Sequence, residues 1–210
     1  MLGAWFCTGA ATDTEGFIAA MNPLYPNHYL LAFSAGQQST PLNALGVPGP
    51  LIATNQALRW EKRNLPLLWN AADFDIALLE SVMHEWIEAS GHKINFEHAQ
   101  RGSEALLCFE WIDQTVLGRD YEVGHTNRRV QENHITYANI SMLRSPAIDR
   151  HLSPVQKRQR LRTTLLHELG HALGVEHSNN PEDVMYYRGW QNPHLTPNDA
   201  QRIRLLYASL

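Results

Sequence analysis

Residues 167–177 of the chain read HELGHALGVEH. His167 and His171 are four residues apart, so on a helix their side chains stand on one face, about 6 Å apart along the axis. Two imidazoles placed in this way can bind the same metal ion. A third ligand requires the helix to end and the chain to turn back, and Gly174 can adopt the positive φ of such a turn before His177. The stretch therefore predicts a metal site with His167, His171 and His177 as ligands at the end of a long helix.

The carboxylate of Glu168 gives this site a chemical function. Zinc prefers imidazole nitrogen in a tetrahedral arrangement, and a catalytic zinc site leaves one position open for water. Glu168 lies about 100° around the helix from His167, so its carboxylate points beside the metal. From there it can accept the proton of the attacking water and later deliver that proton to the leaving amine. We therefore predict one catalytic zinc ion, with Glu168 as the general base.

The long helix has clear start signals in the sequence. Ser153 and Gln156 form a capping box, and Pro154 suits the first helical position because it has no amide to satisfy. The helix should run from Pro154 to about Leu173. A basic stretch, KRQRLR at residues 157–162, falls on this helix and is expected to be a solvated face.

Elements of both kinds precede and follow this helix. Apolar residues at helical spacing predict a helix over residues 72–90, and a C-terminal helix should begin at Thr196. Pro66 is expected to place part of the first strand at an edge or an end of the sheet. A strand, a helix and then several strands indicate a mixed sheet with helices packed on it, in the α/β (α+β) class. The strand-like runs are residues 58–69, 93–97, 105–111, 123–130 and 135–142.

The motif around the histidines resembles that of a known family. HELGHALGVEH fits the signature HExxHxxGxxH of the metzincin zinc peptidases, and Met185 stands where those enzymes carry a methionine turn. Ser178, directly after the third histidine, is typical of the matrixin branch, which comprises the matrix metalloproteinases and their bacterial relatives. RWEKRNLPL resembles the first matrixin strand, and LTPNDAQRIRLLY resembles the C-terminal helix, with Asp199 at a position usually held by Asp.

This resemblance implies a metzincin catalytic domain with a five-stranded, mostly parallel sheet, a long active-site helix and a C-terminal helix. The antiparallel edge strand, here residues 123–130, would align the substrate as an added strand, and Met185 would pack beneath the histidines without binding the metal. Matrixins often carry a structural zinc and calcium ions, but only Asp120 and His125 stand in plausible places for those ligands. We therefore expect one catalytic Zn²⁺, and the residues give little support for a structural zinc or for calcium.

Tyr187 departs from the matrixin pattern. It stands two residues after Met185, as in the astacin and serralysin branches, where that tyrosine can swing between the zinc and the oxyanion. Two roles remain open for Tyr187, namely this switch and a packed tyrosine of the loop beside the cleft.

The composition changes abruptly at Arg59. Residues 1–57 contain no Lys or Arg, and Asp13 and Glu15 are their only charged residues. We expect residues 58–210 to form the zinc peptidase domain and residues 1–57 to form an N-terminal segment, a candidate pro-segment that makes the protein a zymogen. Cys7 is its only candidate for a thiolate that caps the zinc, whereas its apolar surroundings favour an inert thiol.

The overall charge argues against other classes of partner. A formal net charge of −4 and a pI of about 6.2 give no basic surface for nucleic acid, and no apolar stretch is long enough to predict a membrane span.

The opening MLGAWFCTGAA has no basic residue ahead of it, so it is a poor secretory signal. The compartment is therefore not readable from the residues, whereas the resemblance implies a secreted protein. We expect a monomer whose partner is a protein or peptide substrate.

These features predict a metalloendopeptidase that hydrolyses peptide bonds of extended polypeptides through a zinc-bound water. The alternative is a catalytically silent zinc-binding scaffold or binding module of the same fold. Glu168 discriminates between the two, because a binding module needs the histidines but not a carboxylate beside the open metal position. A metallopeptidase with a distant glutamate as third ligand is disfavoured by Gly174 and His177. The substrate and its cleavage preference are not readable.

Overall fold

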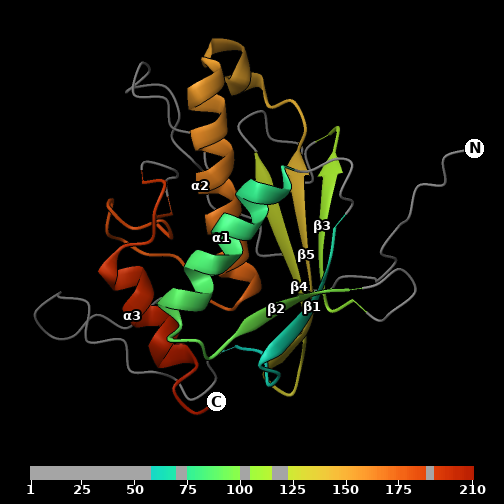
Figure 1. Cartoon of the computed structure of the whole chain (residues 1–210), viewed down its shortest axis with the longest axis vertical. Helices are drawn as coiled ribbons and strands as arrows, with labels where there is room; N and C mark the ends of the chain where they lie inside the picture. The colour runs from blue at the N-terminus through green and yellow to red at the C-terminus, as the bar shows by residue number, and fades with distance from the viewer. Residues whose placement is uncertain (1–57, 70–74, 100–104, 115–122, 188–191) are drawn as a thin grey trace, which may run out of the picture.

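A computed structural model of the chain describes residues 58–69, 75–99, 105–114, 123–187 and 192–210. Within them a five-stranded sheet has the strand order β2-β1-β3-β5-β4, and only β4 runs antiparallel to its neighbour. Figure 1 shows the helices gathered on one side of this sheet. The mixed, mostly parallel sheet and the α/β (α+β) class are thereby confirmed. The strands are β1 (Asn64–Leu68), β2 (Asn95–His98), β3 (Leu107–Ile112), β4 (Gly124–Gln131) and β5 (His134–Leu143).

The described helices also follow the sequence pattern. The helix expected over residues 72–90 begins at Ile76, and the side chain of its N-cap residue Asp75 accepts a hydrogen bond from the backbone of Leu78, while residues 72–74 lie outside the described ranges. Gly91 follows this helix with a φ of 66°. No helix in the described ranges combines the length and the apolar character that a membrane crossing needs. The helices are α1 (Ile76–Ala89), a short 3₁₀ helix η1 (Ala147–His151), α2 (Pro154–Ala172) and α3 (Pro197–Leu206).

Helix α2 has both of the ends that its sequence predicts. The Ser153 side chain accepts from the backbone of Gln156, and the Gln156 side chain accepts from the backbone of Ser153, which completes the capping box. At the other end Gly174 has a φ of 93° and donates to the carbonyl of His171. A Cβ atom at Gly174 would lie 2.0 Å from the carbonyl oxygen of Leu58. Glycine is therefore required there both for the turn and for the close approach of the chain.

Three aromatic side chains hold the second half of α2 in place. The indole of Trp86 in α1 donates to the carbonyl of Leu166, and the indole of Trp60 donates to the carbonyl of Ala172. The Tyr207 hydroxyl, just beyond α3, donates to the carbonyl of Leu173. All three aromatic residues are fully buried, so each bond forms away from water and is worth roughly 1 kcal/mol. They fix the part of α2 that carries the two histidines of the motif.

The expectation that residues 157–162 form a solvated face is wrong for Arg160. Its side chain is only 4% exposed, and its Nε lies 2.7 Å from Oδ1 of Asp149 in η1. The first turn of α2 is exposed, but Arg160 is turned toward η1. A buried guanidinium needs a paired carboxylate, and Asp149 supplies it from the preceding element.

The expected effect of Pro66 on the sheet is also corrected. β1 lies between β2 and β3 rather than at an edge, and Pro66 falls within it. The carbonyl of Pro66 accepts from the backbone of Leu106, while the ladder between β1 and β3 begins only at Leu67 and Leu107. Proline therefore stands just ahead of that ladder, where its missing N–H leaves no strand bond unmade.

Candidate metal centre

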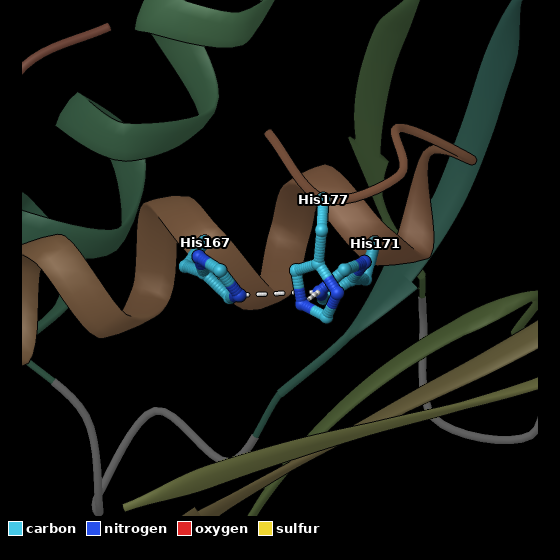
Figure 2. Close-up of side chains that lie close together, drawn as sticks. All are labelled: His167, His171 and His177. Atoms are coloured by element: carbon cyan, nitrogen blue, oxygen red, sulfur yellow. Dashed lines mark hydrogen bonds between the residues drawn. The ribbon is translucent and has the colours of Figure 1, made fainter. Parts of the chain in front are cut away.

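Three histidine rings converge beside the end of α2. His167 and His171 project from successive turns of α2, and His177 follows the turn at Gly174. Figure 2 shows the three rings turned toward one another, two from the helix and one from the segment beyond it. The Nε2 atom of His171 lies 3.1 Å from that of His167 and 3.0 Å from that of His177. Two nitrogens bound to one tetrahedral zinc ion would lie about 3.3 Å apart.

Hydrogen bonds from the protein set which nitrogen of each helix histidine faces the centre. Nδ1 of His167 lies 2.7 Å from the carbonyl oxygen of Val184, and Nδ1 of His171 lies 3.1 Å from that of Val175. A carbonyl only accepts, so the proton of each ring is on Nδ1, and the lone pair of Nε2 is directed at the other rings. This is the tautomer that a metal ligand needs.

The three rings also have the right charge state for a metal. Burial lowers the pKa of His167 to about 4. Burial lowers the pKa of His171 well below its usual range as well. Repulsion between a protonated His171 and the neighbouring rings of His177 and His167 adds to this effect. Burial, together with the positive charges around it, lowers the pKa of His177 to about 2. All three rings are therefore neutral at pH 7, and their donor set of three imidazole nitrogens fits zinc.

Glu168 lies between the two helix histidines in the sequence of α2, is fully buried and is held from β4. Its Oε2 accepts a hydrogen bond of 2.6 Å from the hydroxyl of Thr126, which also lies 3.0 Å from the carbonyl oxygen of Glu168. Gly124 makes room for the carboxylate, since a Cβ there would lie 2.9 Å from Cγ of Glu168. The strand that forms the edge of the sheet therefore also fixes the rotamer of Glu168. Sequence reasoning missed Thr126, because nothing in β4 signals a contact with a residue 42 positions away.

Met185 is fully buried against α2. A Cβ at Gly170 would lie 2.4 Å from the sulfur of Met185 and 2.8 Å from the ring of Trp86, so the glycine between the two helix histidines lets both side chains approach. The carboxylate of Asp199 accepts from the backbone of Val184 at 2.9 Å and of Met185 at 3.4 Å. The start of α3 thus fixes the turn that carries the methionine.

A second carboxylate, that of Asp183, ties the same turn to α3. It accepts from Ser178 and Asn180 within the turn, and from Thr196 and Asn198 at the start of α3. Burial raises the pKa of Asp183, but these four hydrogen bonds together lower it below its ordinary value. Sequence reasoning did not single out Asp183, since its partners come from two separate polar stretches.

Tyr187 and His125 are among the described residues, whereas Cys7 and Asp120 are not. The backbone N–H of Tyr187 donates to the carbonyl of Ser178, and the Tyr187 ring packs edge-on against that of Tyr186. His125 is buried in β4, where its Nε2 lies 3.1 Å from Oδ1 of Asn127. Cys7 and Asp120 lie outside the described residues, as does the whole of residues 1–57. Within the described ranges, the three converging histidines are the group of side chains able to hold a metal ion.

The five-stranded mixed sheet with its three helices is consistent with the metzincin catalytic domain that the motif implied. A family model described as matrixin matches residues 69–208, which is more than half of the chain. The chain therefore belongs to the matrixin family. Membership of this family suggests a zinc metalloendopeptidase.

Individual relatives match over short stretches. The probable matrix metalloproteinase 095L of Invertebrate iridescent virus 3 is 44% identical over 48 residues, which is 21% of this chain and 13% of that protein. Matrilysin of Felis catus is 47% identical over 45 residues, which is 20% of this chain and 17% of that protein. The matched stretches thus cover less than a fifth of either relative.

Proposed function

We propose that this protein is a zinc-dependent endopeptidase that hydrolyses peptide bonds of extended polypeptides. The observation that supports this most directly is the convergence of one ligand nitrogen from each of three histidines within 4.8 Å of one another, together with the buried Glu168 on the helix that carries two of them. His167, His171 and His177 would hold the ion. A bound zinc ion would polarise the scissile carbonyl and acidify the attacking water.

In this proposal the protein's own residues orient the reactants and move the proton. Glu168 accepts the proton of the attacking water and returns it to the leaving amine, and the hydroxyl of Thr126 holds its Oε2 in place meanwhile. β4 pairs with β5 along one side only among the described strands, so an extended substrate can add to its other side through backbone hydrogen bonds. Met185 supports the helix between the two histidines and takes no part in the chemistry.

The competing function is a zinc-binding module that has lost catalysis. Such a module would need the histidines, but burying the carboxylate of Glu168 beside them would cost free energy with no return. Two residues of β4 accommodate that carboxylate: the Thr126 hydroxyl donates to it, and Gly124 leaves the space that it fills. These contacts favour the enzyme.

Cleavage of a random peptide library, read by mass spectrometry, tests the proposal and reads out the cleavage preference. Both the full chain and residues 58–210 should be loaded with zinc and incubated with the library. We expect cuts inside the peptides, since an edge strand binds residues on both sides of the scissile bond. Intact peptides in the presence of both zinc-loaded forms would favour the binding module.

We expect metal analysis of the purified protein to give one zinc per chain. The reason is that matrixin structural sites need ligands that the sequence does not supply around Asp120 and His125. The measurement is elemental analysis after dialysis against metal-free buffer, and calcium should be absent at stoichiometric level. Two zinc ions per chain would contradict this expectation.

We expect Tyr187→Phe to lower kcat roughly 10- to 1,000-fold with little change in KM, as for the loss of one oxyanion donor. The proposal is that the phenol stabilises the transition state, and it rests on the offset of two residues from Met185. Tyr186→Phe is the matched control, because its ring packs against that of Tyr187. An unchanged kcat in Tyr187→Phe would leave Tyr187 a packing residue.

We propose that residues 1–57 lie on the catalytic domain and keep it latent. With Asp13 and Glu15 as its only charges, the segment has apolar side chains to cover, and the side of β4 away from β5 would accept an extended strand. Removing it should leave a folded domain with higher peptidase activity. Cys7→Ala should raise the activity of the full chain only if that thiolate reaches the zinc. A domain that unfolds or loses activity on truncation would show that the segment belongs to the core.

A further inference from the structure

His177 is the candidate ligand that lies outside α2. His167 and His171 are held by the helix backbone, whereas His177 sits in a half-buried segment that is neither helix nor strand. The ring of such a residue is in place only if something holds its backbone, because ordering a loose segment would otherwise subtract from the free energy of metal binding. The contacts that hold residues Glu176 and His177 therefore bear on zinc affinity.

One of these contacts comes from α3. Nη2 of Arg202 donates to the carbonyl of Glu176 at 2.7 Å and to the carbonyl of His177 at 3.0 Å. A single guanidinium nitrogen thus uses both of its hydrogens to fix two successive peptide units, one of them belonging to the ligand itself. Arg202 lies three residues beyond Asp199, which fixes the methionine turn, so α3 supports both sides of the site.

The other contact comes from β4. The side chain of Arg128 is 7% exposed, and its Nη1 donates to the carbonyl of His171 at 3.2 Å. The same guanidinium pairs with Oε1 of Glu176 at 3.2 Å. Arg128 therefore links the last turn of α2 to the turn that leads into His177.

We propose that Arg202, together with the Arg128–Glu176 pair, positions the third histidine and thereby sets the zinc affinity of the site. We refer to these three residues as the arginine clamp. None of them touches the metal or the reacting atoms in this proposal, so they are positioning residues. The inference rests on the proposed zinc site, but not on peptidase activity.

Two effects of Arg202 on the metal have opposite signs, which makes the proposal testable. Its positive charge repels a dication, so removing it would tighten zinc binding if charge dominated. Its two hydrogen bonds order the backbone of His177, so removing them loosens the site if positioning dominates. Loss of a residue that orients a metal ligand typically lowers metal affinity 10- to 100-fold. The repulsion between the Arg202 charge and the metal ion is weaker than that, because it acts partly through solvent in which salt screens it. We expect positioning to win.

The test is the zinc dissociation constant of the full chain, measured by competition with a chromophoric chelator. We expect Arg202→Met to raise this constant roughly 10- to 100-fold. Arg202→Lys should raise it by less, because lysine keeps the charge and a donor but lacks the planar fork of arginine. The matched control is Arg204→Met, which removes an arginine of the same helix that donates to the carbonyl of Ala89 instead. Its zinc affinity should equal that of the parent.

A spectroscopic measurement separates positioning from general destabilisation. With Co²⁺ in place of zinc, the visible absorption bands report the ligand geometry, and we expect them to change in Arg202→Met but not in Arg204→Met. Glu176→Gln is a second variant that should fold, because the Glu176 side chain is 53% exposed, and we expect a smaller rise in the zinc dissociation constant.

The proposal is overturned if Arg202→Met, with circular dichroism and an unfolding curve like those of the parent, binds zinc as tightly or more tightly. Should Arg202→Met fail to fold, unchanged zinc affinities in both Arg202→Lys and Glu176→Gln would overturn it instead. Failure of the proposed function looks different, since the variants would then change zinc affinity as expected while the zinc-loaded protein leaves peptides intact.

Discussion

Glu168→Ala is expected to keep its zinc and lose nearly all peptidase activity, with a fall in kcat of roughly 100- to 10,000-fold for the loss of a general base. The three histidines are untouched by this change, so the metal ligands survive. The Thr126 hydroxyl loses Oε2 as an acceptor but still lies 3.0 Å from the carbonyl oxygen of residue 168, so no buried donor is left unpaired. Peptide cleavage and metal content, measured on the same preparation, separate the two effects.

Two further variants test whether the loss of activity comes from the missing base. Glu168→Gln keeps the shape of the side chain and can still bond to Thr126, so equal losses in the Ala and Gln variants would assign the effect to the missing base rather than to packing. Glu182→Ala changes an exposed glutamate near the methionine turn and should leave kcat unchanged. Full activity in Glu168→Ala would refute the assignment of Glu168.

His171→Ala is expected to lose the metal itself. Structural zinc sites bind with about 10–16 kcal/mol, so one of three protein ligands is worth about 4 kcal/mol, or roughly a 1,000-fold increase in the zinc dissociation constant. His171 is the middle ligand of the three, with Nε2 atoms at about 3 Å on both sides, so its loss leaves two rings without a shared centre. Elemental analysis and chelator competition would measure the effect.

The control for this variant is His84→Ala, because His84 is also a helical histidine but its side chain is 73% exposed on α1. It should bind zinc like the parent and cut peptides at the same rate. A His171→Ala protein that retains one tightly bound zinc per chain would show that the metal is held elsewhere.

Local signals predicted much of the fold. The capping boxes at Ser153 and Thr196 and the turn at Gly174 are set by neighbouring residues, so the ends of α2 and the start of α3 could be read from the sequence. The antiparallel edge strand over residues 123–130 came from the family resemblance and appears as β4 (Gly124–Gln131).

The sequence could not show which residues far apart in the chain contact one another. The burial of Arg160 depends on Asp149 standing in η1, and the order of the sheet decided that Pro66 lies inside it. At the site, Thr126 meets Glu168 only because β4 packs along α2. The same holds for Arg202, which meets His177 across 25 residues. Such pairs follow from the packing of whole elements, and no local pattern encodes them.

The most direct test of the central claim is a zinc titration of metal-free protein, with peptide cleavage followed at each step, in both the full chain and residues 58–210. We predict that cleavage is absent without metal, rises in proportion to zinc and levels off at one equivalent per chain, with the shorter form more active. If both forms take up one equivalent of zinc at the three histidines and neither cuts any peptide, the proposed endopeptidase function is wrong.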